Sequence, residues 1–192
     1  MTLPTRDKIL QSGAQLIHLK GYAATGLQEI LQDAGVPKGS FYFYFRSKED
    51  FGLALVEYYQ QRLAELASPV TRDTTLTPLQ RLSDFFTLFR NHFAQEGFVK
   101  GCPIGNLIQE LGDVNAAFRT KLQTPMENLI RFVARQLHEA QERGELSEKL
   151  PAADTARFII SAWQGALLQM KVCAGPEPLD NFHQMVFNIL LT

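Results

Sequence analysis

The sequence predicts an all-α protein of about nine helices, and three observations carry that prediction. Apolar residues recur at helical spacing along most of the 192-residue chain, and no segment alternates for long as a strand does. Glycines, prolines and polar clusters separate these segments, as helix ends require. The composition, 45% apolar and 20% charged, is that of a folded globular protein.

Net charge, targeting signals and cysteine content say less about the class of protein than the helical spacing of apolar residues does. The net charge of −1 gives no general preference for nucleic acid, so any charge for DNA binding must be local. The N-terminus lacks the apolar core of a signal peptide, and no apolar run reaches the roughly 18–20 residues that span a membrane. Two cysteines make no disulfide framework. We therefore expect a cytoplasmic protein with reduced thiols, no membrane contact and no cofactor.

The first two helices are expected from residue 6 to about residue 34. Apolar positions over residues 6–20 define the first, which ends before Gly21. Thr25 and Gln28 have the spacing of a capping box at the start of the second. Thr25 would cap this helix, place its N–H groups against a phosphate, or do both. Gln28, in the same turn, can reach a phosphate or a base edge.

A tight turn then leads into a third helix over residues 38–45. Gly35 suits the left-handed position that closes the second helix, and Pro37 suits the first turn of the third. Two helices joined by a short turn that contains glycine form a helix-turn-helix. The second helix of that motif enters the major groove of DNA. The segment therefore predicts a DNA-binding element.

The third helix carries side chains that suit DNA. Lys38 should neutralise a phosphate, and Gly39 lets the backbone approach closely because it has no side chain. Ser40, Tyr42 and Tyr44 can donate hydrogen bonds to phosphates or base edges. We expect all five residues to contact DNA.

Five consecutive aromatic residues, Phe41 to Phe45, divide between the two faces of this helix. Phe41 and Phe45 pair at i,i+4 and should point into the core. Phe43 projects outward and has no polar atom, so its best contact in a major groove is a thymine methyl group. Packing of Phe43 inside the protein is the alternative.

Six more helices are expected in the rest of the chain. Ser47 has an acid three residues on, which opens a fourth helix that runs to about residue 67. A polar loop is expected over residues 68–77, and the fifth helix starts at Pro78. The last four helices are expected over residues 104–111, 115–143, 153–173 and 179–191. Pro125 should kink the helix over 115–143 or start it afresh. We divide the chain into a DNA-binding domain over 1–46, a linking helix over 47–67, and a C-terminal effector-binding and dimerisation domain over 68–192.

The C-terminal domain offers a candidate effector pocket and a candidate dimer surface. Aromatic stripes and nearby polar groups could line an apolar pocket, or could be ordinary core. The residues expected at the pocket are Phe89, Phe93, Cys102, Asn106, Met126, Trp163 and Met170. The last two helices carry more apolar residues than a terminal helix pair buries alone, so two pairs could form a four-helix interface. The residues expected there are Phe158, Trp163, Leu167, Phe182, Met185 and Ile189.

Cys102 is a candidate for redox chemistry. It precedes a short helix and lies two residues from Lys100. A thiol near a helix N-terminus and a cation can be reactive. Lys171, near the end of a long helix, could also approach Cys102 in the fold. A buried, inert cysteine is the alternative.

Residues 6–60 resemble the N-terminal domain of TetR-family transcriptional regulators. The matching segments are Gly21-Tyr-Ala-Ala-Thr25, Ile30, Ala34-Gly-Val-Pro-Lys-Gly-Ser-Phe-Tyr42, Tyr44-Phe45 and Ser47-Lys-Glu-Asp-Phe51. The resemblance implies a homodimeric repressor that binds a roughly palindromic double-stranded DNA operator and is released by an effector. Lys48 matches a phosphate-clamping position of the family. Phe43 departs from the family, which often has histidine or tyrosine there.

The second half carries a weaker likeness. Gly101-Cys-Pro-Ile-Gly-Asn-Leu and Trp163-Gln-Gly-Ala-Leu-Leu-Gln-Met-Lys171 resemble a branch of the family that includes sensors of reactive electrophiles. That resemblance suggests oxidation or alkylation of Cys102 as the release signal.

The sequence as a whole predicts a sequence-specific DNA-binding transcriptional regulator. A helical small-molecule-binding protein, or an enzyme, without DNA binding is the alternative. The four histidines lack the paired spacing of a metal site, and neither a glycine-rich phosphate loop nor a nucleophile elbow occurs. The alternative would also have to bury the segment from Lys38 to Tyr42, which its outward-facing side chains oppose.

Overall fold

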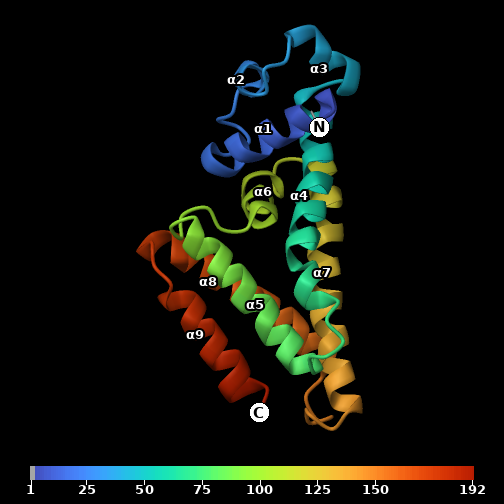
Figure 1. Ribbon diagram of the computed structural model, residues 1–192, viewed down its shortest axis with the longest axis vertical. Helices are drawn as coiled ribbons and strands as arrows, with labels where there is room; N and C mark the ends of the chain where they lie inside the picture. Colours follow the sequence, from blue (N-terminus) through green and yellow to red (C-terminus); the bar gives the residue numbers. More distant parts are fainter. Residues whose placement is uncertain (1–2) are drawn as a thin grey trace. The chain divides into compact units, whose positions relative to one another are not determined.

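A computed structural model describes residues 3–192 of the chain (Figure 1). Over these residues it contains nine α-helices, one short π-helix and no strand, which confirms the predicted fold class. The elements are α1 (Thr5–Lys20), α2 (Leu27–Asp33), α3 (Lys38–Tyr44), α4 (Lys48–Thr71), α5 (Pro78–Gln95), α6 (Pro103–Leu111), α7 (Ala116–Glu142), α8 (Ala152–Cys173), α9 (Glu177–Met185) and η1 (Val186–Leu190). No helix in this part of the chain is long and apolar enough to cross a membrane.

The chain packs into two compact units that do not follow the order of the sequence. The first ends at Leu63 and also takes in Pro103–Thr124, which contains α6 and the start of α7. The second consists of Ala64–Cys102 and Pro125–Thr192. By packing, α6 therefore belongs with the N-terminal helices. This division is distinct from the functional division into domains expected from the sequence.

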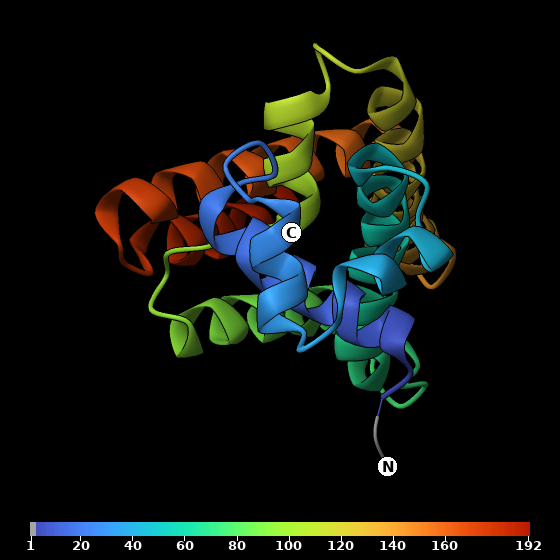
Figure 2. The same ribbon diagram turned by 90° about the horizontal axis from the view of Figure 1, so that it is seen from above.

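Helices α1, α2 and α3 pack against one another at the N-terminal end of the first unit (Figure 2). Ile9, Ile30 and Phe41 are each fully buried there. Gly35 closes α2 with a φ of +63°, the left-handed conformation expected for it, and the N–H of Val36 donates to the carbonyl of Leu31 at 3.0 Å. The turn between α2 and α3 therefore has the geometry that a helix-turn-helix needs.

Helix α4 begins as the sequence predicts and ends later than expected. The Ser47 hydroxyl accepts a hydrogen bond from the N–H of Asp50 at 3.0 Å, so Ser47 caps the helix. The helix then continues through Pro69 to Thr71, whereas a loop was expected from residue 68. Pro69 removes one N–H donor and crowds the carbonyl four residues earlier, but the bond from the Arg72 N–H to the Ser68 carbonyl extends the helical pattern beyond it.

Two other helices differ from the prediction. Helix α7 continues through Pro125 as one helix, so of the two outcomes expected there, a kink or a fresh start, the fresh start does not occur. Burial of Leu122, Pro125 and Val133 on this helix offsets the roughly 3 kcal/mol that an internal proline costs. At the C-terminus, the last helix changes at Val186 from α-helical to π-helical hydrogen bonding.

The second unit has a core of aromatic rings, tilted or edge-on to one another, between α5, α8 and α9. The Phe86 ring lies 5.0 Å from that of Trp163 and 4.9 Å from that of Phe182, measured between ring centroids. Helices α8 and α9 run side by side in both views (Figures 1 and 2). This antiparallel pair presents its remaining apolar side chains outward.

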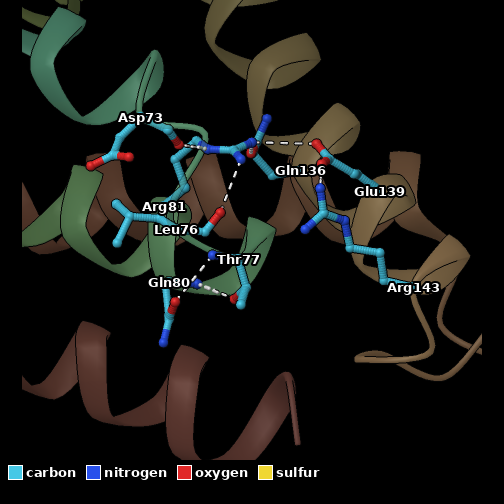
Figure 3. Close-up of polar contacts among 8 residues, drawn as sticks. All are labelled: Asp73, Leu76, Thr77, Gln80, Arg81, Gln136, Glu139 and Arg143. Carbon is cyan, nitrogen blue, oxygen red and sulfur yellow. Dashed lines mark hydrogen bonds and ion pairs between the residues drawn. The ribbon is translucent and has the colours of Figure 1, made fainter.

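A buried arginine fastens the loop before α5 to α7 (Figure 3). Arg81 donates to the carbonyls of Asp73 and Leu76 at 3.0 and 3.1 Å. It also donates to the Gln136 side chain at 2.7 Å and pairs with Glu139 at 3.3 Å. One guanidinium therefore satisfies acceptors from two segments that lie far apart in the sequence.

Candidate nucleic-acid interface and effector site

The outer face of α3 is aromatic and exposed. Phe43 has 83% of its surface exposed, and Tyr42 and Tyr44 are also exposed. Lys38 and Gly39 are exposed at the start of the helix, and Ser40 is half-buried. The outward orientation predicted for the aromatic side chains is therefore confirmed, and the inward packing of Phe43 is excluded.

The inner face of α3 anchors the helix. Phe41 is fully buried and Phe45 nearly so, as the sequence predicts. Their rings lie 5.9 and 5.2 Å from the ring of Phe51 on α4. Burial of three aromatic side chains holds α3 firmly, and this leaves its opposite face to a partner.

The start of α2 differs from the prediction at Thr25. Gly26 is the N-cap residue and no side-chain cap forms, so the expected capping box of Thr25 and Gln28 is wrong. The Thr25 side chain is fully buried, and its hydroxyl donates instead to the Gly21 carbonyl at 2.7 Å. Thr25 thus shapes the turn between α1 and α2 from inside, while Gln28 is exposed.

Lys48 bonds to the turn between α1 and α2. Its ammonium donates to the Tyr22 carbonyl at 2.7 Å and lies 4.7 Å from the centre of the Tyr22 ring. Burial lowers the pKa of Lys48, and the charge of Glu110 partly offsets that shift. The Tyr22 hydroxyl in turn donates to the Lys48 carbonyl at 2.9 Å. Burial and the charges of Glu49 and Glu110 raise the pKa of Tyr22 to about 12, so this hydroxyl keeps its proton.

Glu110 is a member of this cluster that the sequence did not point to. Its carboxylate accepts hydrogen bonds from the N–H groups of Tyr22 and Ala23, at 2.8 and 2.6 Å. The partners are 88 and 87 residues apart, so no local pattern could reveal the contact. Only the packing of α6 beside the N-terminal helices brings them together.

The expected effector residues fall into two groups. Phe89, Phe93, Trp163 and Met170 are buried in the second unit, where the Phe93 and Trp163 ring centroids are 6.4 Å apart. Met126 and Cys102 are half-buried in that unit. Asn106 lies on α6 in the first unit. Asn106 is therefore assigned to a different unit from the other expected residues.

The second unit also contains a surface hollow between α5 and α9. It has a volume of about 350 Å³, with Phe86 and Trp163 among the residues that line it. Arg90 and Asp180, also part of the lining, form an ion pair at 2.9 Å. Of the expected effector residues, Trp163 alone lines this hollow.

Lys171 lies beside Cys102, and the absence of a side chain at Gly101 leaves room for it. Gly101 has a φ of +71°, and a β-carbon there would lie 2.7 Å from Cε of Lys171. Burial lowers the pKa of Lys171, and the charge of Cys102 partly offsets the shift. Lys100, the cation nearest in sequence, forms an ion pair with Glu96 at 3.0 Å. The structure therefore brings together the thiol and the more distant of the two lysines.

The expected dimer residues divide between core and surface. Trp163, Leu167 and Phe182 are buried within the protomer, so they are not available as exposed contacts. Phe158, Met185 and Ile189 are exposed and line a groove of about 630 Å³ between α8 and the α9–η1 segment. Their apolar surface is the part of the predicted set that a second chain can reach.

Comparison with known proteins gives consistent matches over most of the chain. Residues 9–55 match the family of bacterial regulatory proteins called tetR, and residues 78–186 match the tetracyclin repressor-like C-terminal domain. The transcriptional regulator AcuR of Cereibacter sphaeroides is 41% identical over 176 residues, which cover 92% of this chain and 80% of that protein.

Two solved structures are similar in both sequence and fold. The regulatory protein TetR from Rhodobacter sphaeroides has a TM-score of 0.89 at 39% identity, with 97% of this chain and 98% of that chain covered. The reduced form of NemR from Escherichia coli has a TM-score of 0.85 at 33% identity, with 96% of each chain covered. NemR of that organism is a helix-turn-helix transcriptional repressor, 34% identical over 98% of this chain and 94% of that protein.

Proposed function

We propose, since this chain belongs to the TetR family of bacterial transcriptional regulators, that it is a homodimeric repressor released by modification of Cys102 or by an effector. Family membership makes it a DNA-binding regulator, rather than a helical binding protein or enzyme without DNA binding. A bacterial regulator that binds DNA acts where the DNA lies, so we place the protein in the cytoplasm. The observation that carries the proposal is the exposed aromatic face of α3 above a fully buried Phe41.

The DNA contacts that we assign come from α3 and its neighbours. Tyr42 and Tyr44 donate to phosphates or base edges, Phe43 contacts a thymine methyl group, and Lys38 neutralises a phosphate. An ammonium has three N–H donors, so Lys48 can bond to the Tyr22 carbonyl and still reach a phosphate. The remaining assigned contacts are those of Gln28, Gly39 and Ser40. Because Thr25 is buried, we assign it to support of the turn before α2.

Dimerisation uses the groove between α8 and the α9–η1 segment. Phe158, Met185 and Ile189 expose 61%, 51% and 60% of their surface, more than a solvated face normally carries in one place. Two such helix pairs placed face to face form a four-helix interface with two-fold symmetry. That symmetry requires a roughly palindromic operator.

The release signal acts at Cys102 or in the apolar interior of the second unit. The Lys171 ammonium favours a thiolate at Cys102, which is the form that electrophiles and oxidants attack. In alkylation the thiolate forms a bond to an electrophilic carbon, which gives up a leaving group or the electron pair of its double bond. In oxidation a peroxide transfers one oxygen to the sulfur, which gives a sulfenic acid and releases water or an alcohol. NemR, a repressor, has been crystallised in a form described as reduced, which agrees with thiol chemistry in this branch of the family. A non-covalent ligand among Phe89, Phe93, Trp163 and Met170 is the second route.

Titration into labelled DNA tests this proposal. The protein is titrated into duplex from the region upstream of its own gene and into a scrambled duplex, before and after treatment with a thiol-reactive electrophile. We expect binding to the upstream duplex only, lost on treatment. Cys102→Ser should bind equally and resist the reagent, while Cys173→Ser is the matched control that stays sensitive.

Each alternative outcome has a distinct meaning. Specific binding that ignores the reagent would contradict the thiol switch and leave a non-covalent effector. Binding to neither duplex, at low salt, would contradict the assignment of an operator near the gene.

A further inference from the structure

The turn between α1 and α2 is built around a carboxylate that comes from α6. The N–H groups of Tyr22 and Ala23 are consecutive, and both point at Glu110, at 2.8 Å to Oε2 and 2.6 Å to Oε1. Successive backbone N–H groups in a turn form a cradle for an anion. Hydrogen bonds to an ionised carboxylate are also about twice as strong as neutral ones. The contact is therefore a specific attachment between α6 and the turn.

The shape of the turn fits this carboxylate closely. Gly21 has a φ of +91°, and a β-carbon at that position would lie 3.2 Å from Glu110 Oε2. The Gly21 carbonyl accepts a hydrogen bond from the Thr25 hydroxyl, and this bond fixes the other side of the turn. A side chain at residue 21 would both strain the backbone and crowd the carboxylate. The turn is thus formed to receive Glu110.

The same turn is held independently from α4 and α7. Tyr22 and Lys48 exchange two hydrogen bonds, at 2.7 and 2.9 Å. The Tyr22 ring meets the Phe118 ring edge-on, with 5.2 Å between centroids. The contacts from Glu110 reach this turn from α6, the helix that begins at Pro103, and Pro103 is bonded to Cys102.

We infer that Glu110 is a positioning residue through which α6 sets the helix-turn-helix for operator binding. The turn is the chain's connection from α1 to α2, and α2 packs on α3, so its position decides where α3 meets DNA. Helix α6 has nine residues and is therefore about 13 Å long. A helix this short can move as a rigid body. A shift at its first turn displaces Glu110 and the turn with it. The link from Cys102 to this shift rests on the proposed function.

Glu110→Gln tests the positioning role. Glutamine keeps the size of the side chain but turns one of the two acceptors into a donor that faces an N–H group. We expect the amides of Tyr22 and Ala23 to exchange with deuterium roughly tenfold faster. Operator affinity should fall roughly tenfold or more. The control is Glu127→Gln, which removes the same charge from an exposed site on α7 and should change affinity less than about twofold.

Two further variants separate positioning from loss of folding. Glu110→Asp keeps the charge but shortens its reach, so its operator affinity should lie between those of wild type and Glu110→Gln. Circular dichroism must show the same helix content in all variants. Unchanged amide exchange, or unchanged operator affinity, in a folded Glu110→Gln protein would overturn the inference.

The coupling between Cys102 and Glu110 is measured as a ratio of operator affinities. Operator affinity is measured before and after the thiol-reactive electrophile, and the ratio of the two is compared between proteins. Wild type should show a ratio of roughly ten or more, and Glu110→Gln a ratio near one. An equal ratio in both proteins would overturn the coupling. A ratio near one in wild type would mean that the proposed thiol switch has failed, and the exchange and affinity of untreated Glu110→Gln would still decide the positioning role.

Discussion

Single residues of α3 have opposite environments within a few positions. Phe41 is fully buried against Phe51, whereas Phe43, two residues later, exposes 83% of its surface. A helix turns by about 100° per residue, so neighbouring aromatic side chains necessarily point in different directions. An exposed phenylalanine contributes little to folding, and its surface is available for a partner.

Replacement of Phe43 by alanine should relax base selectivity without affecting stability. Loss of the contact with a thymine methyl group should cost about 1–2 kcal/mol at one base step of each half-site. Operator variants with each base at every position, measured by fluorescence anisotropy, would locate that step. Phe43→Leu retains an apolar contact and should keep most of the preference for T. An alanine variant with the wild-type preference at every step would contradict the assigned contact.

Among the structural elements, the loop before α5 depends most on a single side chain. Arg81 is buried and binds two loop carbonyls and two side chains of α7 (Figure 3). The sequence gives no sign of this role, because the acceptors lie 5 to 58 residues away. The loop and α7 are therefore fastened together by one buried polar group.

Substitution of Arg81 by methionine should lower the free energy of unfolding by about 3 kcal/mol, because it leaves buried acceptors without donors. Urea unfolding at fixed protein concentration measures this change. Arg143→Met is the matched control, since it removes an exposed partner of Glu139 and should cost less than about 0.5 kcal/mol. Equal losses in the free energy of unfolding for the two substitutions would contradict the stabilising role assigned to Arg81.

For the whole molecule, we propose that operator binding depends on two copies of the chain. One helix-turn-helix reads one half-site, and linkage of two of them raises the affinity for a complete operator by about 10²–10⁴-fold. The groove formed by Phe158, Met185 and Ile189 is the surface that we assign to this linkage.

A charge in the groove should separate the two copies. Ile189→Glu would place a carboxylate in an apolar interface, so we expect a monomer in light scattering and roughly hundredfold weaker operator binding. Val114→Glu makes the same change at an exposed site between α6 and α7 and should leave the dimer intact. A dimeric Ile189→Glu protein with full operator affinity would place the interface elsewhere.

Local sequence patterns were enough to predict the helices, the helix-turn-helix and the inner and outer faces of α3. These depend on local spacing, and the glycine turn and the i,i+4 pair of Phe41 and Phe45 are visible in a few residues. Local spacing failed at Thr25. This residue has the pattern of a cap, but its side chain is buried and its hydroxyl donates to the Gly21 carbonyl instead.

Contacts between groups far apart in the chain become visible only in the folded structure. Trp163, Leu167 and Phe182 have the same apolar character as Ile189, and their burial within one protomer follows from the packing of α8 and α9. Lys171 lies beside Gly101, and Glu110 beside Tyr22, because helices far apart in the chain pack together. Hydrogen bonds and charges act over a few ångströms in space, whatever the separation along the chain, so the sequence alone could not reveal these pairs.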